Sequence, residues 1–457
     1  MNVPWTAHEW KKVLVYGLGS SGRSAVRLLG EHGVRVVAVD RRPAAELNLG
    51  ELSTRPGVDL LLGSEPTGLP QNVDGVVVSP GVPQDRPLLN AARAQGLVVI
   101  SEVELASIFV NGPIVGITGS NGKSTTTALT GALLESAGFD VEVCGNIGVP
   151  LSSRLTGPEG RVFVVELSSF QLESIATLHP RVAALLNITP DHLDRHGGFR
   201  RYLEAKTAIF GSQTGDDFAV LNADDPIVRD VGTAARRRYF SRLSTPQEGC
   251  YLEGEAVFQV EPNGTRTRLF ERRDLRLLGA HNVENAMAAA LIALSVGAAS
   301  ETFAHALSVF EGLPHRMQVV ARVDGVIWLD DSKGTNVGAT LKSLADLRNR
   351  SVHLIVGGRN KGADLSLLAE EVERTAKRVY LIGEAASELA HALPPSVAQH
   401  RSGDLESAVR AAAEGTCSGD TVLLSPACAS FDQYESYIQR GEHFQRLVLE
   451  MTGERDG

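Results

Sequence analysis

Two features that many proteins carry are missing from this sequence. It contains no run of about twenty apolar residues, the length that a membrane-spanning helix needs. Its first residues, MNVPWTAHEWKKVLVYG, also lack the long apolar segment of a secretory signal peptide. We therefore expect no membrane insertion and a cytoplasmic location.

Cysteine is scarce, with four residues in the whole chain. These cysteines are far apart, and their spacing matches no metal-binding motif. The sequence therefore predicts a reduced protein without a cysteine-bound metal. The four residues are Cys144, Cys250, Cys417 and Cys428.

Positive charge is also in short supply. The chain has 44 basic and 54 acidic residues, which gives a formal net charge of −10. This balance argues against broad binding of nucleic acid or of an anionic membrane. There is no internal repeat and no low-complexity tract. We expect a monomer that acts on small molecules and has no nucleic-acid partner.

The order of predicted elements points to an α/β fold. Short apolar runs alternate with helical patterns throughout the 457 residues, a length that allows about three domains. This alternation implies mainly parallel sheets. We place the domains at residues 1–110, 111–312 and 313–457. The first and third are expected to be Rossmann-like, and the second to resemble a P-loop ATPase.

The segment VGITGSNGKSTTTALTGALL, residues 115–134, looks like a phosphate-binding loop with one departure. The pattern G-x-x-x-x-G-K-[ST] requires a glycine where Ile117 stands. Gly119 and Gly122 still allow backbone N–H groups to turn toward an anion. Lys123 supplies a cation, and Ser124 places a hydroxyl at the helix start, where it can bind Mg²⁺. We interpret the segment as a nucleotide site, and a plain turn is the alternative.

A second glycine motif, GLGSSG, lies near the N-terminus at residues 17–22. It follows a predicted strand and opens a helix, and Asp40 ends the next strand. This arrangement is typical of dinucleotide-binding folds, so an NAD-dependent dehydrogenase is one possible function. The same geometry can hold the diphosphate of a UDP-linked ligand. A dehydrogenase would leave the P-loop and the segment DDSKGTN unexplained.

Several polar residues have two readings from sequence alone. Glu166 ends an apolar run and could bind a metal or lie at a solvated strand end. His192 follows another apolar run and could be a ligand or a structural histidine. Lys206 looks like an ordinary helix-surface lysine. Asn282 could be a helix N-cap, and Arg316 could be a linker charge.

The chain carries the segments TGSNGKS, VELSSFQLE, NITPDHLDRH, YLEAK, AHNVENAMAA, HRMQ, DDSKGTN, GGRNKGADL and SPACASFDQY. Taken together, these motifs resemble the Mur ligase family. The resemblance implies an ATP-dependent ligase that converts a carboxylate into an acyl phosphate and captures it with an amine. It is most similar to the member that adds D-glutamate to UDP-N-acetylmuramoyl-L-alanine in peptidoglycan precursor synthesis. A folylpolyglutamate synthetase-like ligase, which shares the P-loop but has no such N-terminal domain, is the rival within this chemistry.

The resemblance also implies roles for individual residues, with ATP and Mg²⁺ as cofactors and a carbamate on Lys206. The implied catalytic residues are Lys123, Glu166, His192, Lys206 and Lys333. The implied metal ligands are Ser124, Glu166, His192 and Lys206. The implied ATP contacts are Gly119, Ser120, Asn121, Gly122, Lys123, Ser124, Thr125, Asn282, Arg316 and Asp331.

Substrate contacts are implied in the same way. Two positions depart from the family pattern, since Ser21 stands where threonine is common and Tyr437 where phenylalanine is familiar. The Asp-Asn-Pro-Arg motif of the relative that adds a diamino acid is absent, which favours D-glutamate. The implied contacts with the UDP-linked substrate are Ser20, Ser21, Asp40, Arg41, Ser79, Gly81, Asn146, Ser168, Gln171 and His192. Those with the amino acid are Thr335, Lys361, Ser430, Phe431 and Tyr437.

Overall fold

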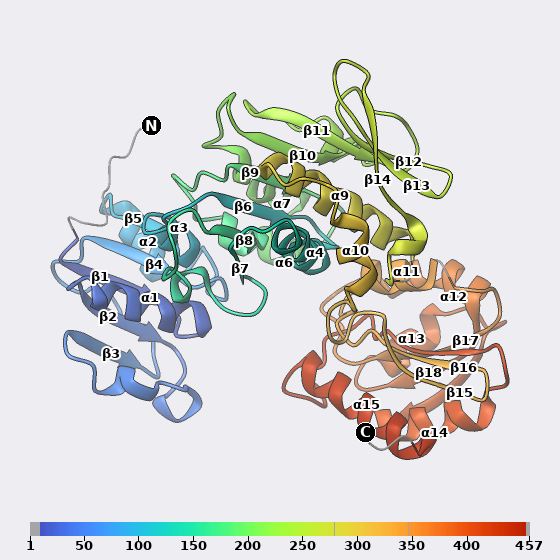
Figure 1. Ribbon diagram of the computed structural model, residues 1–457. Helices are drawn as coiled ribbons and strands as arrows, with labels where there is room; N and C mark the ends of the chain where they lie inside the picture. The colour runs from blue at the N-terminus through green and yellow to red at the C-terminus, as the bar shows by residue number, and fades with distance from the viewer. Residues whose placement is uncertain (1–9, 278, 346, 454–457) are drawn as a thin grey trace. The chain divides into compact units, whose positions relative to one another are not determined.

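The computed structural model describes residues 10–277, 279–345 and 347–453 (Figure 1). The chain divides into two compact units. The first comprises the described residues of Met1–Asp274 together with Glu284–Ser308. The second comprises those of Leu275–Val283 together with Val309–Gly457. The first unit contains two β-sheets and the second contains one.

The N-terminal sheet has five parallel strands in the order β3-β2-β1-β4-β5. Its central strands are largely apolar on both sides because helices cover both faces. Val13 and Val15 face one core, whereas Leu14 and Tyr16 face the other. The elements are β1 (Lys12–Tyr16), α1 (Ser20–Glu31), β2 (Arg35–Asp40), β3 (Val58–Leu62), β4 (Gly75–Val78), α2 (Pro87–Ala94), β5 (Val98–Ser101) and α3 (Glu102–Ser107).

The carboxyl end of β1 is a topological switch point. Strand β1 pairs with β2 on one side and with β4 on the other. The chain therefore leaves β1 toward one half of the sheet and later returns to build the other half. Open α/β sheets bind their ligands outside the strand ends at such a point. The fold thus predicts a ligand site above residues 17–22.

The central sheet has nine strands in the order β14-β13-β12-β11-β10-β9-β6-β8-β7. Pairing is parallel from β7 to β12 and antiparallel among β12, β13 and β14. The strands are β6 (Ile114–Thr118), β7 (Val141–Gly145), β8 (Val162–Glu166), β9 (Val182–Leu185), β10 (Phe218–Asn222), β11 (Arg236–Ser241), β12 (Gly249–Glu253), β13 (Ala256–Val260) and β14 (Arg266–Glu271). The helices are α4 (Lys123–Ser136), α5 (Ser169–Leu172), α6 (Leu193–His196), α7 (Phe199–Thr207), α8 (Pro226–Arg229), α9 (Ala280–Val296) and α10 (Phe303–Val309).

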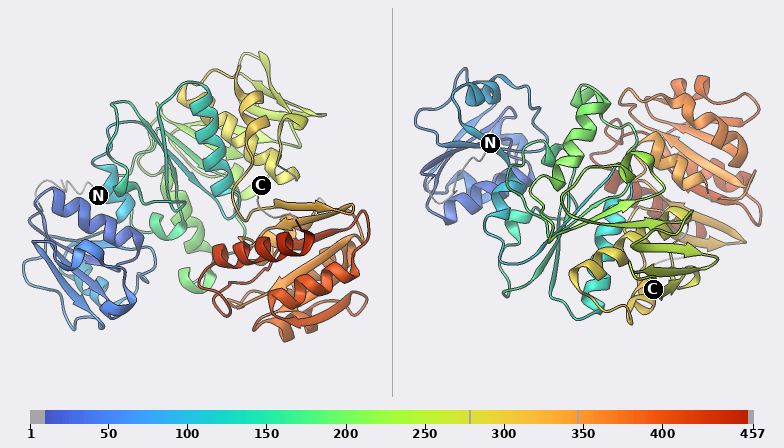
Figure 2. Two further views of the ribbon diagram at one scale, coloured as in Figure 1. Left: turned by 60° about the horizontal axis from the view of Figure 1, so that its bottom comes forward. Right: turned by 90° about the horizontal axis from the view of Figure 1, so that it is seen from above.

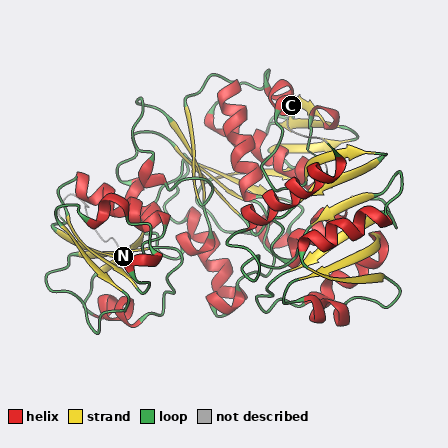
Figure 3. Cartoon of the chain, turned by 90° about the horizontal axis from the view of Figure 1, so that it is seen from below, coloured by secondary structure: helices red, strands yellow, loops and turns green. Residues whose placement is uncertain are grey.

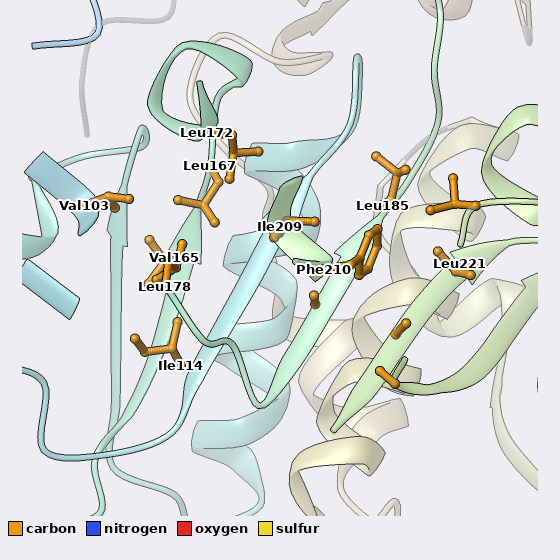
Figure 4. Close-up of a cluster of buried hydrophobic side chains, with 14 of the residues drawn as sticks. Val103, Ile114, Val165, Leu167, Leu172, Leu178, Leu185, Ile209, Phe210 and Leu221 are labelled. Carbon is orange, nitrogen blue, oxygen red and sulfur yellow. The ribbon is translucent and has the colours of Figure 1, made fainter. Parts of the chain in front are cut away.

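Packing against this sheet fixes the position of helix α7. Ile209 and Phe210, which directly follow the helix, enter the core beside Leu185 of β9 (Figure 4). Gly116 in β6 leaves the necessary space, because a Cβ atom there would lie 3.1 Å from Cδ1 of Ile209. Helix α7 is therefore anchored next to the strand that feeds the P-loop. This anchoring decides the environment of Lys206, which lies on the same helix.

The sheet of the second unit has six strands in the order β15-β16-β20-β17-β18-β19. Only β15 runs antiparallel to its neighbour. Figure 2 shows helix α15, in red, against the strands of this sheet, and Figure 3 distinguishes strands from helices throughout the chain. The elements are β15 (Gln318–Val323), β16 (Val326–Asp330), α11 (Val337–Ala345), β17 (Val352–Gly357), α12 (Ala369–Thr375), β18 (Ala376–Ile382), α13 (Ala386–Ala392), β19 (Ala398–Gly403), α14 (Leu405–Gly415), β20 (Thr421–Leu424) and α15 (Tyr437–Thr452).

The α/β class, the three-domain organisation and the mainly parallel pairing are confirmed. The domain limits at residues 110 and 312 stay predictions. The antiparallel strands β13, β14 and β15 did not follow from the alternation of β and α patterns. Within residues 10–277, 279–345 and 347–453, the structure contains no helix that is long and apolar enough to cross a membrane.

Candidate active site

The P-loop connects β6 to α4 and needs both of its glycines. Gly119 has a φ of 156° and Gly122 a φ of 86°, values that favour glycine. Space is equally restrictive, because a Cβ atom on Gly122 would lie 2.4 Å from Oδ1 of Asn285. Helix α4 begins at Lys123, so its first backbone N–H groups point out of the helix end toward the loop. This is the geometry of an anion-binding site.

Hydrogen bonds to other residues of the central domain hold the P-loop in position. Ser120 Oγ lies 2.7 Å from the hydroxyl of Tyr202 and donates to the carbonyl of Thr189 at 2.9 Å. The backbone N–H of Asn121 donates to Oδ1 of Asn187 at 2.8 Å. The Ser120 side chain is therefore an anchor for the loop, and its implied contact with ATP stays a prediction. Asn187 and Tyr202 were missed in the sequence, although a polar residue soon after an apolar strand was a usable signal for Asn187.

Two lysines converge on one carbonyl oxygen of the loop. Nζ of Lys123 lies 2.9 Å from the carbonyl oxygen of Gly119, and Nζ of Lys206 lies 2.7 Å from the same atom. Lys206 is only 1% exposed, so the reading as a helix-surface lysine is wrong. Burial, reinforced by the neighbouring Lys123, lowers the pKa of Lys206 well below its usual value. The amine is therefore readily deprotonated and can act as a nucleophile.

Glu166 combines burial with an unmatched oxygen. It is the last residue of β8, next to Ile117 of the P-loop strand. Its Oε1 accepts a hydrogen bond from Nδ2 of Asn146 at 2.6 Å. Its Oε2 is buried and has no hydrogen-bond partner among the described residues. A buried carboxylate oxygen without a donor fits a cation ligand.

The oxygen donors near the P-loop suit Mg²⁺ bound together with phosphates. Ser124 and Thr125, in the first turn of α4, are both buried. Over the described part of the chain, no group of three His, Cys, Asp or Glu side chains could hold a metal ion. Mg²⁺ usually takes one or two protein oxygens and completes its shell with substrate phosphates and water. The residues present fit that mode of binding.

Two histidines border this region, and they have different environments. His192 has a left-handed backbone (φ 52°) just before α6, and its side chain is 38% exposed. Its Nε2 lies 3.7 Å from Oδ2 of Asp191. His196 is buried, with Nδ1 2.8 Å from Oε1 of Glu173 and Nε2 3.0 Å from Oγ of Ser169. The structural role thus falls to His196, and the His192 side chain remains partly exposed.

A cavity of about 570 Å³ lies at the switch point of the N-terminal sheet. Its volume lies within the range of small-molecule sites. Its walls come from the end of β1, the GLGSSG turn, the ends of β2 and β4, and two segments of the central domain. Eight residues assigned from the resemblance to the UDP-linked substrate line it, namely Ser20, Ser21, Asp40, Arg41, Ser79, Gly81, Asn146 and Gln171. The cavity is also lined by Tyr16, Arg42 and Arg86, which were not predicted from the sequence as site residues.

The other two residues assigned to that substrate, Ser168 and His192, are not among those that line the cavity. Ser168 caps helix α5 by accepting the N–H of Gln171. Oε1 of Gln171 in turn accepts from the Ser168 N–H at 2.9 Å. This capping box fixes the Gln171 side chain at the cavity wall.

Asp40 holds the end of β2 together. Its carboxylate accepts from the Leu18 N–H at 2.7 Å and from Nη2 of Arg42 at 2.8 Å. Burial opposes its ionisation, but the hydrogen bonds from Arg42 and Leu18 outweigh burial and lower the pKa of Asp40 to about 2. Asp40 therefore fixes the cavity wall, and Arg42, which sequence reasoning passed over, is its charge partner.

We expect Asp40→Asn to destabilise the N-terminal domain by about 1 kcal/mol at neutral pH, allowing for the half-exposed Arg42. The folded-state pKa of about 2 lies below the ordinary value of 3.8. The stabilisation is thus complete above about pH 4 and is lost as the pH falls toward 2. Thermal unfolding of the variant and wild type should converge over that interval. Asp59→Asn, at an exposed site on β3, is the control, and equal melting curves at pH 7 would contradict the assignment.

The second unit brings together two residues assigned to the nucleotide. Asp331 is buried, and its Oδ2 accepts from Oγ of Ser343 and Oγ of Ser425, both at 2.7 Å. Burial raises the pKa of Asp331, and the nearby Arg316 opposes that rise. Nε of Arg316 is buried without a hydrogen-bond partner in the described part of the chain. Helix α9 begins at Ala280, so Asn282 lies in its first turn and is not the N-cap.

Of the residues that the resemblance assigns to the amino-acid substrate, the structure brings only some close together. Nζ of Lys333 lies 5.7 Å from the ring centre of Tyr437, and Ser332 Oγ donates to the Tyr437 carbonyl at 2.8 Å. The N–H of Thr335 donates to the Lys333 carbonyl at 2.8 Å, which makes a tight turn beside them. Ser430 is buried and lies two residues after Cys428, which is also buried. Lys361 is exposed, and Phe431 is 63% exposed.

Arg440 organises this region, and no motif in the sequence pointed to this residue. Its guanidinium group is buried and donates to the Ser332 hydroxyl at 3.0 Å and the Ser332 carbonyl at 2.9 Å. It also donates to the Cys428 carbonyl at 3.3 Å. The loop that contains Lys333 is thereby tied to the loop that contains Ser430.

Comparison with known protein families shows which family the chain belongs to. The family model described as the Mur ligase middle domain matches residues 117–293, and that of the glutamate ligase domain matches residues 315–428. The MurD-like N-terminal domain matches residues 11–101. The chain belongs to the Mur ligase family. This membership excludes the dehydrogenase that GLGSSG suggested.

Curated members of the Mur ligase family are similar to the chain over nearly its whole length. A UDP-N-acetylmuramoylalanine–D-glutamate ligase of Koribacter versatilis is 41% identical over 97% of this chain and 98% of its own. The ligase of the same name from Myxococcus xanthus is 45% identical over 96% of this chain and 98% of its own. The ligase of the same name from Geotalea uraniireducens is 44% identical over 96% of this chain and 97% of its own.

Solved structures of Mur ligases share the fold at low sequence identity. MurF ligase from Thermotoga maritima, solved in complex with ADP, superimposes with a TM-score of 0.62 at 18% identity, covering 98% of this chain and 99% of that one. UDP-N-acetylmuramate-alanine ligase MurC from the same organism gives a TM-score of 0.61 at 19% identity, covering 96% and 99%. These likenesses show the Mur ligase fold.

Proposed function

We propose that this chain is an ATP-dependent ligase that adds D-glutamate to UDP-N-acetylmuramoyl-L-alanine in peptidoglycan precursor synthesis. The observation that carries the proposal is the identity of 41–45% with three curated ligases of that name, each over at least 96% of this chain. The match of residues 11–101 to a MurD-like N-terminal domain separates the chain from folylpolyglutamate synthetase-like ligases, which share the P-loop but have no such N-terminal domain.

The reaction needs charge neutralisation and alignment more than a covalent nucleophile. The terminal carboxylate of the precursor attacks the γ-phosphorus of ATP, and ADP leaves. The amine of D-glutamate then attacks the acyl phosphate, loses a proton and displaces inorganic phosphate. Lys123 at the start of α4 supplies a positive charge where the phosphoryl group is transferred, and the helix end adds its dipole. The family resemblance also assigns Lys333 to the transferring phosphoryl group.

We assign Mg²⁺ to Ser124, Glu166, His192 and a carbamate on Lys206. Mg²⁺ supplies neutralisation of the phosphate charge when it is bound. The unmatched Oε2 of Glu166 supports its part in this set. The lowered pKa of Lys206 supports carbamate formation, because only the neutral amine reacts with CO₂.

Glu166→Gln should raise the Mg²⁺ concentration needed for half-maximal activity by about 100-fold. The amide keeps the shape of the side chain and can still pair with Asn146, but it removes the negative charge. Initial rates measured over a series of Mg²⁺ concentrations will show the shift. Glu135→Gln, on the exposed side of α4, is the matched control and should leave the Mg²⁺ dependence unchanged. An unshifted Mg²⁺ curve for Glu166→Gln would remove this carboxylate from the metal site.

The function is tested by ATP-dependent phosphate release with UDP-N-acetylmuramoyl-L-alanine as the acceptor. D-glutamate, L-glutamate and diaminopimelate are compared at equal concentration, and the new amide is identified by mass spectrometry. We expect product with D-glutamate alone. Preference for another amino acid would assign the chain to a different ligase of the family. We further propose that the protein works as a cytoplasmic monomer, which size-exclusion chromatography and cell fractionation can test.

A further inference from the structure

Arg195 connects helix α6 of the central domain to a loop that lines the N-terminal cavity. Its Nη2 donates to the carbonyl oxygen of Val82 at 2.7 Å and to that of Pro80 at 3.0 Å. Its Nη1 donates to the carbonyl of Gly81 at 3.5 Å. One guanidinium group thus contacts three successive carbonyls, a pattern that its planar fork of donors permits.

Contacts within the central domain hold this guanidinium group in place. It lies 4.6 Å from the ring centre of Phe170, over the ring face, and Nη2 is 3.9 Å from Oε2 of Glu173. Its side chain is only 17% exposed. Phe170 also contacts the ring of His192 edge-on, at 5.0 Å between ring centres. Arg195 and His192 therefore share one aromatic support.

The turn that carries both residues is short and bounded by unusual backbone. Helix α6 has four residues, with His192 (φ 52°) before it and Gly197 (φ 69°) after it. A four-residue helix has little stability of its own and takes its position from tertiary contacts. The bonds from Arg195 to residues 80–82 are such contacts, so the position of that loop bears on the position of His192.

On its other side, the loop of residues 79–82 packs on the GLGSSG turn. Ser79 Oγ donates to the Gly17 carbonyl at 2.6 Å. Gly17 has a φ of 91°, and a Cβ atom there would lie 2.7 Å from Cγ2 of Val82. Gly17, Ser79, Pro80, Gly81 and Val82 all line the cavity. A continuous series of contacts thus runs from the cavity wall through Arg195 to the turn that begins at His192.

We propose that Arg195 is a positioning residue that couples binding of the UDP-linked substrate in the cavity to the placement of His192. This inference rests on the proposed function. Arg195 touches the carbonyls behind the cavity wall and does not line the cavity itself. Its side chain orders the 79–82 loop for the substrate and, through α6, places His192 for the phosphoryl-transfer step.

The test compares Arg195→Ala, Arg195→Lys and the control Arg200→Ala. Arg200 lies nearby on α7, its side chain is 92% exposed, and it pairs only with Glu204 through its side chain among the described contacts. We expect Arg195→Ala to raise KM for the UDP-linked substrate about 10-fold and to lower kcat by about 100-fold, the scale of a misplaced catalytic group. KM for ATP should stay within about 2-fold of wild type, since the P-loop is not displaced.

Rescue distinguishes positioning from general damage. Lysine offers one point charge in place of a fork, so Arg195→Lys should recover only part of the loss. Guanidinium chloride at millimolar concentration should restore part of the activity of Arg195→Ala and none of that of Glu166→Gln. Circular dichroism and thermal unfolding verify the fold of each variant, and Arg195→Lys serves alone if the alanine variant is unfolded.

The inference is overturned if Arg195→Ala behaves as Arg200→Ala does, or if affinity for ATP falls as much as affinity for the UDP-linked substrate. Calorimetric titration of each ligand separately measures these affinities without turnover. Failure of the proposed function would look different, because wild-type protein would then form no amide product. A wild type that forms product, with variants that show no selective loss, rejects the role of Arg195 alone.

Discussion

Lys123→Ala is expected to reduce ATP-dependent phosphate release by about 10³-fold, the loss seen when one preorganised charge is removed from a transition state. Lys123 opens helix α4 and already reaches the carbonyl oxygens of Gly119 and Ser120 at 2.9 Å. It can exchange these bonds for the terminal phosphates of ATP without moving the backbone. Coupled-enzyme detection of phosphate under saturating substrates measures the effect on kcat.

Two observations separate this effect from loss of structure. Lys11→Ala removes an exposed lysine before β1 and should retain full activity. Calorimetry should show that Lys123→Ala still binds the UDP-linked substrate, because Lys123 is not among the residues that line the N-terminal cavity. Near-normal phosphate release by Lys123→Ala would mean that the glycine loop is a plain turn, the alternative that sequence alone left open.

Local motifs could be predicted because their physics is local. A strand, two glycines and a Gly-Lys-Ser helix start specify the P-loop within ten residues, and the structure has this geometry from Gly119 to Ser124. The cavity is different, since its walls come from six separate stretches of chain. Its residues could be named only through the resemblance, and the β1 switch point is what brings them together.

Residues that act through distant hydrogen bonds were not predictable from local patterns. Arg42 next to Asp40 reads as a surface charge, and Tyr202 reads as an ordinary helix aromatic. Asn187 lies far from Asn121 in sequence, and only the pairing of β6 with β9 brings the two together. Strand β14 (RTRLFE) was not predicted for a related reason. Its exposed half carries arginines, and it lacks the apolar run of a buried strand.

Lys206 shows how packing overrides a surface-like sequence. In α7, the buried residues are Tyr202, Ala205 and Lys206, so the lysine lies one turn after a buried tyrosine. Its Nζ is 4.9 Å from the ring centre of Tyr202. The (i, i+4) spacing from an aromatic residue was available in the sequence. It could not show that Ile209 and Phe210 anchor the helix beside the P-loop.

Lys206→Ala is expected to lower activity by about 10²- to 10³-fold, because it removes an anion proposed to support Mg²⁺. Added short carboxylates, such as acetate or propionate, should restore part of the activity by occupying the space that the side chain leaves. The fold should survive, since Lys123 still donates to the Gly119 carbonyl. Rates measured with and without carboxylate, for this variant and for Lys123→Ala, give the comparison. Rescue should be confined to Lys206→Ala.

The chemistry behind this prediction can be observed directly. CO₂ accepts the lone pair of the neutral Nζ, an N–C bond forms, and one proton is released, so a neutral group next to Lys123 becomes an anion. The attraction between this anion and the ammonium group of Lys123 favours the carbamate. Protein equilibrated with ¹³C-labelled bicarbonate should show one carbamate carbon resonance that is missing in Lys206→Ala and present in Lys11→Ala. A wild-type spectrum without it, together with failure of carboxylate rescue in a folded variant, would leave Lys206 as a neutral amine that anchors the Gly119 carbonyl.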